Sequence, residues 1–124
     1  MKLDPDCVRD ILLSVEKHST MTTRTSTKDF DDDGLFGKYD SQKVDYHVRY
    51  ADEAGLLNVD WSFDGYDIRD LSPEGHDFLS NIRKDENWLK TKNIAEKAGS
   101  SSLNVLKNIA SSVATAALNH YLGL

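Results

Sequence analysis

An acidic run in the first third of the chain has the residue types and spacing of a calcium-binding loop. Asp29, Asp31 and Asp33 take positions one, three and five of such a loop, Gly34 takes position six and Asp40 takes position twelve. The twelfth ligand is normally a bidentate Glu, and the Thr-rich stretch before the run makes a poor entering helix. The alternatives are a solvated acidic loop or a weak divalent-cation site, and Asp40 also suits a helix cap.

Other groups with metal-binding or catalytic chemistry are few. His47 and His76 would bind zinc with a carboxylate if the fold joined them, although a buried His more often takes one hydrogen bond. Cys7, the only cysteine, lies among apolar helix positions, which favours a structural thiol. The chain has no nucleophile elbow, no Gly-rich phosphate loop and no metalloprotease histidine pair. We therefore expect no enzyme, no cofactor and no small-molecule substrate.

Helical patterns flank this acidic run on both sides. Before it, Asp4 or Asp6 caps a helix that buries apolar side chains at helical spacing through about Lys17. The Thr-rich residues 18–28 favour an edge strand or an ordered loop, and residues 29–37 read as a loop. After them, Asp40 or Ser41 caps a second helix that Gly55 ends.

A strand pair and a third helix follow directly. The period-two pattern of a strand with one buried face is formed by Leu57, Val59, Trp61 and Phe63. Asp64-Gly65 supplies a hairpin turn, and a helix that begins at Ser72-Pro73 buries Phe78, Leu79 and Ile82. This order predicts an α+β, mostly α, winged-helix-like domain over residues 1–84, with core packing as the role of the hairpin aromatics.

Residues 85–124 are expected to form a helical extension that completes one compact unit. Helical character continues to about Ala98, Gly99 stops it, and a last helix begins at Leu103. That helix carries an apolar stripe that either packs on its own domain or pairs two chains. The stripe residues assigned to a homodimer are Leu106, Ile109, Val113 and Ala117.

The second helix and the wing hold the candidate nucleic-acid contacts. As a recognition helix, the second helix would turn polar and basic side chains toward a DNA groove, with one further cation on the wing. These candidates are Gln42, Lys43, Tyr46, Arg49 and Arg69. Carboxylates share the same surface, and each unpaired one opposes the gain from counterion release. They are Asp45, Asp52 and Glu53.

The charge balance keeps two functions open. Residues through Leu71 hold 9 basic and 16 acidic side chains, a net charge of −7. Such a field repels DNA unless the cations are segregated, so a DNA-binding regulator and a protein-interaction module with an acidic surface are both consistent. No stretch of about 20 apolar residues predicts a membrane span, and the acidic N-terminus lacks the features of a signal peptide, which favours the cytoplasm.

Two segments carry a family resemblance. One is Asp45-Tyr46-His47-Val48 leading to Glu53-Ala54-Gly55-Leu56, and the other runs from Leu71-Ser72-Pro73-Glu74-Gly75-His76 to Asp85 and Trp88. Together with the C-terminal residues Tyr121-Leu122-Gly123-Leu124, these sequence segments resemble a bacterial and prophage family, the domain of unknown function numbered two-five-one-three. The resemblance implies a winged-helix-like domain with a helical extension, often encoded near phage or mobile-element genes, and it assigns no activity.

Overall fold

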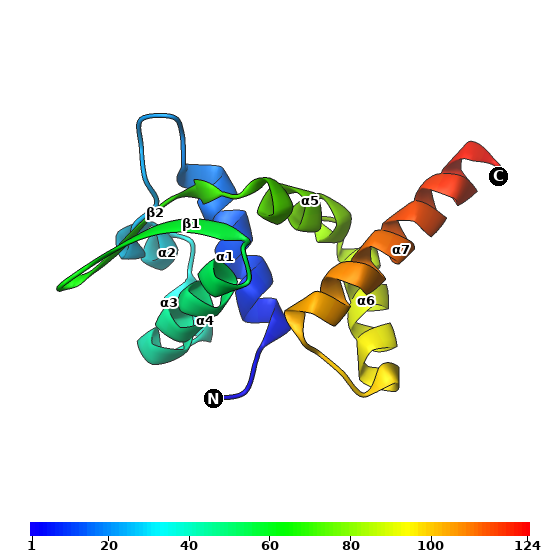
Figure 1. Ribbon diagram of the computed structural model, residues 1–124, viewed down its shortest axis with the longest axis horizontal. Coiled ribbons are helices and arrows are strands. Elements are labelled where there is room, and N and C mark those ends of the chain that lie inside the picture. The colour runs from blue at the N-terminus through cyan, green and yellow to red at the C-terminus, as the bar shows by residue number, and fades with distance from the viewer. The chain divides into compact units, whose positions relative to one another are not determined.

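The computed structural model describes residues 1–124, which form two compact units, Met1–His76 and Asp77–Leu124. The sequence placed the division after residue 84, whereas the units divide earlier, within helix α5 (Pro73–Ile82). The chain has seven helices and one two-stranded hairpin, which makes it an α+β protein that is mostly α (Figure 1). None of the helices combines the length and apolar character needed to cross a membrane.

Helix α1 (Pro5–His18) begins as its sequence predicts. The Asp4 carboxylate accepts the backbone N–H of Asp6 at 3.0 Å, and Pro5 occupies the first helical position, where a missing N–H costs nothing. One side of the helix is fully buried, through Val8, Ile11, Leu12 and Val15. Helix α1 contacts α4 (Ser41–Glu53) and strand β2 (Gly65–Leu71) in the first unit.

The acidic segment is helical rather than a loop, which corrects the expectation for residues 29–37. Helix α2 (Thr27–Asp32) starts with a capping box in which the Asp29 carboxylate accepts the Ser26 N–H at 2.9 Å. Gly34, at φ 82°, turns the chain into α3 (Leu35–Lys38). Phe30 and Leu35 are buried. A cap and two buried apolar side chains therefore outweigh the high Asp and Gly content.

Strand β1 (Leu57–Ser62) pairs antiparallel with β2, and Thr25 adds a single bridge to this hairpin. The N–H of Thr25 donates to the carbonyl of Ile68 and the N–H of Ile68 donates back, both at 2.9 Å. The Thr-rich stretch therefore contributes one residue of edge strand. The order α1, bridge, α2, α4, hairpin is that of a winged helix, and α2 is the element of it that the sequence predicted as a loop.

The outer half of the hairpin is exposed, which corrects the predicted buried strand face. Leu57 is buried, but Trp61 is 40% exposed and Phe63 is fully exposed. Ser62 pairs with Gly65, so the turn residues are Phe63 and Asp64 rather than Asp64 and Gly65. The only third strand is the bridge at Ile68, so no further strand covers the end of the hairpin.

The hairpin is fixed to the start of α5 by a close backbone approach. A Cβ on Gly75 would lie 2.0 Å from the carbonyl oxygen of Leu56, so only glycine fits there. The Ser72 hydroxyl accepts the Gly75 N–H at 3.0 Å and donates to the carbonyl of Gly55. This corner sets where β2 ends relative to α4, and therefore positions the hairpin beside that helix.

In the second unit, the last residues of α5 are followed by α6 (Asp85–Ala98) and α7 (Leu103–Leu122). Helices α6 and α7 contact each other. Gly99, at φ 75°, ends α6, and the Ser102 hydroxyl caps α7 by accepting the Val105 N–H at 3.2 Å. Both boundaries agree with the sequence prediction. The buried side chains of the two helices are Trp88, Thr91, Ala95, Leu103, Leu106, Ala110 and Val113.

Candidate partner-binding face

Helix α4 and the hairpin present one polar surface, which we call the α4–hairpin face. Asp40 caps α4 by accepting the Lys43 N–H at 2.8 Å, and Val44, Val48 and Ala51 are buried on its inner side. The opposite side of α4 therefore points outward next to β1 and β2, which the Gly75 corner holds in place. The face consists of Gln42, Asp45, Tyr46, Arg49, Asp52, Trp61, Phe63 and Tyr66.

Two of the predicted phosphate-binding cations already have carboxylate partners. The ammonium of Lys43 lies 2.7 Å from Asp4, and this hydrogen bond raises the pKa of Lys43. The guanidinium of Arg69 lies 2.9 Å from Asp60, which also pairs with Arg24. The hydrogen bond from Arg69 is the main cause that holds the pKa of Asp60 below its usual value. Neither cation is available without losing an ion pair.

The other three residues predicted to contact DNA, Gln42, Tyr46 and Arg49, differ in how exposed they are. Gln42 and Arg49 are exposed, as the recognition-helix prediction requires. Tyr46 is half-buried, and its ring packs edge-on against His47 and beside Tyr50. Arg49 has no ion pair, but its guanidinium lies 4.5 Å from the centre of the Trp61 ring. The structure thus brings Tyr46 and Arg49 together and leaves Lys43 and Arg69 outside the face.

A groove of about 320 Å³ runs between α4 and the hairpin. On its hairpin side, the rings of Trp61 and Tyr66 lie 5.1 Å apart. The indole N–H of Trp61 donates to Asp52 at 2.9 Å, and the hydroxyl of Tyr66 donates to Asp45 at 2.7 Å. Burial and the Asp45 carboxylate raise the pKa of Tyr66, which keeps it a neutral donor. The groove is therefore lined by the Asp45 carboxylate, the Arg49 guanidinium and aromatic rings.

The hairpin aromatics are the face residues that sequence reasoning missed. Trp61 and Phe63 continue the alternation of β1 and were read as core, yet both lie at the surface. A signal was present in the sequence, because Ser62 and Asp64 surround Phe63 with polar turn residues. A fully exposed Phe at a turn lowers solubility, so its exposure is informative.

The four residues of the calcium-loop prediction lie on or at the ends of helices α2 and α4. Asp29 and Asp31 lie on α2, Asp29 caps that helix, and Asp40 caps α4. Nowhere in residues 1–124 do three or more His, Cys, Asp or Glu side chains gather in a way that could hold a metal ion. The residue spacing matches that of a calcium-binding loop. However, the backbone of residues 27–32 is helical, whereas a calcium loop must wrap around the ion so that the ligand oxygens converge.

Asp33 has a different role from the other acids, because it joins α1 to the α2–α3 turn. Its carboxylate accepts hydrogen bonds from Ser14 at 2.6 Å, Lys17 at 2.8 Å and His18 at 2.9 Å. We call these four residues the Asp33 cluster. Burial raises the pKa of Asp33, but the hydrogen bonds from Lys17, Ser14 and His18 outweigh it and leave that pKa below its usual value.

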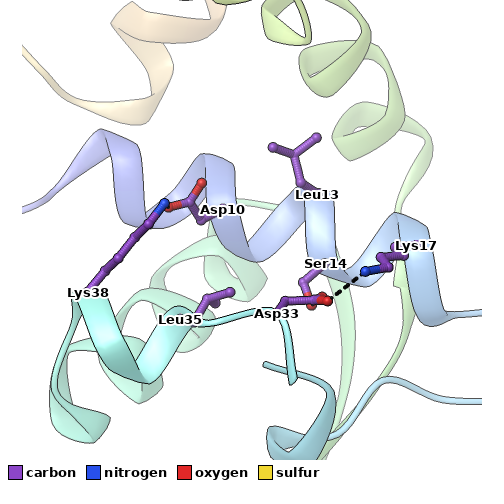
Figure 2. A pocket seen from close by; sticks show the side chains of 7 residues that line it. All are labelled: Asp10, Leu13, Ser14, Lys17, Asp33, Leu35 and Lys38. Atoms are coloured by element: carbon purple, nitrogen blue, oxygen red, sulfur yellow. Dashed lines mark hydrogen bonds and ion pairs between the residues drawn. The ribbon is translucent and has the colours of Figure 1, made fainter. Parts of the chain in front are cut away.

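A pocket of about 260 Å³ lies beside this cluster, and Figure 2 shows the side chains that line it. At one end, Lys38 reaches back from α3 until its ammonium is 3.6 Å from Asp10 of α1. The hydroxyl of Tyr39 also donates to Asp10 at 2.8 Å, and burial together with this carboxylate raises the pKa of Tyr39. Lys17 and Asp33 pair at the other end. The polar groups of the pocket hold α1 and α3 together and leave no unpaired group aimed into it.

The two histidines have separate partners. His47 is fully buried, and its Nε2 accepts the backbone N–H of Asp4 at 2.8 Å while its Nδ1 donates to the carbonyl of Lys43 at 2.7 Å. His76 is half-exposed and lies 3.9 Å from Asp70. The hydrogen bonds of His47 tie the start of α1 to α4. Cys7 is also buried. Desolvation is the main cause that raises the pKa of its thiol to about 12, so Cys7 stays a neutral thiol.

The predicted dimer stripe is only partly free. Leu106 and Val113 are buried and Ile109 is half-buried, so most of the stripe is used inside the chain. Ala117 is exposed. A helix that crosses a partner helix can bury only the turns that overlap it, which is why the stripe divides. Exposed apolar side chains instead continue toward the end of α7, at Leu118, Tyr121 and Leu122.

Comparisons with known proteins place the chain in a family. Residues 2–101 match the family described as hypothetical protein (DUF2513), and the chain belongs to that family. A protein of Haemophilus influenzae, described as an uncharacterized protein, is 35% identical over 119 residues, which cover 91% of this chain and 95% of that protein. No solved structure matches the chain. The family description names no activity, so function has to be argued from the α4–hairpin face.

Proposed function

We propose that the protein is a non-enzymatic interaction module whose α4–hairpin face binds a basic segment of another protein. The observation that supports this most directly is that Lys43 and Arg69, the cations expected to contact phosphate, are paired with carboxylates. The face that remains offers Asp45, Asp52 and exposed rings, and its one cation, Arg49, lies over the Trp61 ring. Such a surface complements lysine and arginine side chains.

The charge of the whole first unit supports the same choice. Residues 1–76 contain 9 Lys and Arg and 17 Asp and Glu, a net charge of −8. This field attracts a basic partner and speeds its encounter, whereas it repels the phosphate backbone of DNA. The partner class that fits is a cytoplasmic protein with a basic surface, such as a component of host or phage machinery.

The apolar contact in this interface comes from Phe63. It is fully exposed at the tip of the hairpin and directly follows Ser62, which lines the groove between α4 and the hairpin. Interface energy usually concentrates on a few large side chains surrounded by polar contacts. We therefore assign Phe63 as the anchor and Asp45 and Asp52 as the groups that select a basic partner.

A second candidate function is DNA binding by α4 as a recognition helix. It is favoured by the winged-helix order of the elements and by Gln42 and Arg49, which are exposed and have no ion pair. In this alternative, Arg49 would leave the Trp61 ring to contact a base or a phosphate. Asp45 and Asp52 flank it and oppose that contact.

Fluorescence anisotropy with two labelled probes, a pool of Lys- and Arg-rich peptides and a pool of short duplexes, separates these functions. We expect saturable binding of peptides and none of duplexes at moderate salt. The double variant Asp45→Lys/Asp52→Lys should abolish peptide binding, while Asp31→Lys/Asp32→Lys, with the same charge change on α2, should retain it. Duplex binding that is lost in Lys43→Ala/Arg49→Ala would instead establish the DNA function.

A further inference from the structure

Arg49 is the one cation that lines the groove between α4 and the hairpin, and an aromatic ring alone holds it there. Its guanidinium lies 4.5 Å from the centre of the Trp61 ring. It makes no hydrogen bond and no ion pair, although a guanidinium carries several N–H donors. An exposed cation–π contact is a weak attachment, so Arg49 can leave the ring at little cost.

Two carboxylates flank Arg49 along α4, and neither pairs with it. Asp45 precedes Arg49 by one helical turn and Asp52 follows it by one turn, which places both on the same side of the helix. Asp45 instead accepts the Tyr66 hydroxyl at 2.7 Å, and Asp52 accepts the Trp61 indole N–H at 2.9 Å. Each bond uses one oxygen, and no other protein group bonds to the second oxygen of either carboxylate. The carboxylates therefore keep acceptor positions for a cation other than Arg49.

The size and chemistry of the groove suit one arginine side chain. Its volume of about 320 Å³ is at the lower end of the range for ligand pockets, roughly 300–1,000 Å³, so it admits a side chain rather than a folded segment. The rings of Trp61 and Tyr66, 5.1 Å apart, line its hairpin side next to Asp45. A planar guanidinium stacks on such rings and pairs with a carboxylate through two parallel N–H bonds, whereas an ammonium lacks this geometry.

We propose that the groove binds one arginine side chain of the partner protein, which replaces Arg49 on the Trp61 ring and pairs with Asp45. This inference rests on the function proposed for the α4–hairpin face and specifies the ligand of that face. In the unbound protein, Arg49 occupies the position of the partner's guanidinium. When the partner binds, Arg49 turns outward into solvent, because two cations repel each other over one ring. The Asp52 carboxylate keeps the indole in place during this exchange.

Arg49 therefore opposes the binding of a basic partner, since it covers the ring and adds a like charge. Removal of its guanidinium should tighten binding by about two- to fivefold, which corresponds to the strength of one exposed cation–π contact. The DNA alternative predicts the opposite sign, because there Arg49 contacts a base or a phosphate and its loss weakens binding to duplexes.

Fluorescence anisotropy of the full chain with two labelled peptide pools tests this inference. One pool is Arg-rich, and the other has Lys at every Arg position, so the two carry equal charge. We expect the wild type to bind the Arg-rich pool at least about threefold more tightly than the Lys pool. Arg49→Gln should bind the Arg-rich pool about two- to fivefold more tightly than the wild type does, and Gln preserves the helix.

Lys28→Gln is the matched control for this measurement. It removes the same charge from α2, where Lys28 pairs with Asp32 and does not line the groove. This variant should bind both pools as the wild type does at moderate salt, because distant surface charges are screened. Circular dichroism of both variants confirms that the helices are intact.

Nuclear magnetic resonance gives a second readout, the side-chain Nε–H signal of Arg49, assigned by its absence in Arg49→Gln. This signal should move when an Arg-rich peptide binds, because the guanidinium leaves the Trp61 ring. The inference is overturned, with the interaction module intact, if the wild type binds both pools equally, if Arg49→Gln gains no more than Lys28→Gln, or if the Arg49 signal stays in place. If neither the wild type nor Arg49→Gln binds either pool, the inference and the proposed function fail together.

Discussion

The Asp33 cluster and the α4–hairpin face are both rich in carboxylates, but they use them in opposite ways. Asp33 is surrounded by donors from α1, and its side chain is 12% exposed. Asp45 and Asp52 each accept one hydrogen bond at the surface, which leaves their remaining oxygen positions open to solvent. The comparison teaches that acidic density alone does not locate a site, since the carboxylates with the most partners hold the fold.

The largest expected effect comes from the corner that positions the α4–hairpin face. Gly75→Ala should lower the free energy of unfolding by about 3 kcal/mol, because the new Cβ would collide with the carbonyl of Leu56. Urea titration measures this loss. Gly37→Ala, on α3 with nothing within 4 Å of the added Cβ, should leave stability equal or slightly higher. Equal effects of the two variants would contradict the close approach at Gly75.

Removal of the Asp33 carboxylate ranks next. Asp33→Ala should cost about 2 kcal/mol, because Ser14 and His18 lose the acceptor that joins α1 to the α2–α3 turn. Thermal unfolding of the purified variant gives the value. Binding of basic peptides should be unchanged at temperatures where the variant is folded. Loss of peptide binding with retained stability would mean that the two regions have been assigned the wrong way round.

The pH dependence of stability sharpens the same assignment. The pKa of Asp33 is lowered from 3.8 in the folded chain, so folding favours its ionised form. The stability it contributes is therefore fully present above pH 3.8 and is lost as the pH falls through the lower folded-state pKa. Urea titrations of wild type and Asp33→Asn should differ by a constant amount near neutral pH and converge in acid. A difference that grows in acid would contradict the sign.

The smallest expected effect on stability is at the hairpin tip. Phe63→Ser should change the free energy of unfolding by less than about 0.5 kcal/mol, because the ring is fully exposed. The same variant should weaken peptide binding, since the anchor of the proposed interface is removed. Calorimetry and anisotropy on one preparation measure both. A large loss of stability would show that Phe63 packs in the folded protein and has no role as an anchor.

Local patterns predicted the elements well where one residue type decides the outcome. Asp4, Asp40 and Ser102 cap helices as their types suggest, and Gly55 and Gly99 take the positive φ that ends a helix. The Asp29–Gly37 segment was misread because its capping box and buried Phe30 compete with Asp and Gly content, and only tertiary packing decides between them.

The candidate face was harder to predict than the fold. Whether Lys43 is free depends on Asp4, which lies on another element and is 39 positions away, and Arg69 depends in the same way on Asp60 across the hairpin. Spacing along α4 identified Arg49 correctly as exposed but could not show its contact with Trp61. Whether Trp61 and Phe63 are covered depends on how many strands join the hairpin, and a single bridge at Thr25 leaves them open.

The most direct test of the central claim is a nitrogen-15 NMR titration of the full chain with a basic peptide selected from the pool. The account predicts that shift changes concentrate on α4, on β1 and around the indole N–H of Trp61, that they saturate, and that duplex DNA at the same salt leaves these signals in place. Saturable changes on α4 with DNA, together with none for the peptide, would contradict the proposed partner and identify the face as a DNA-binding surface.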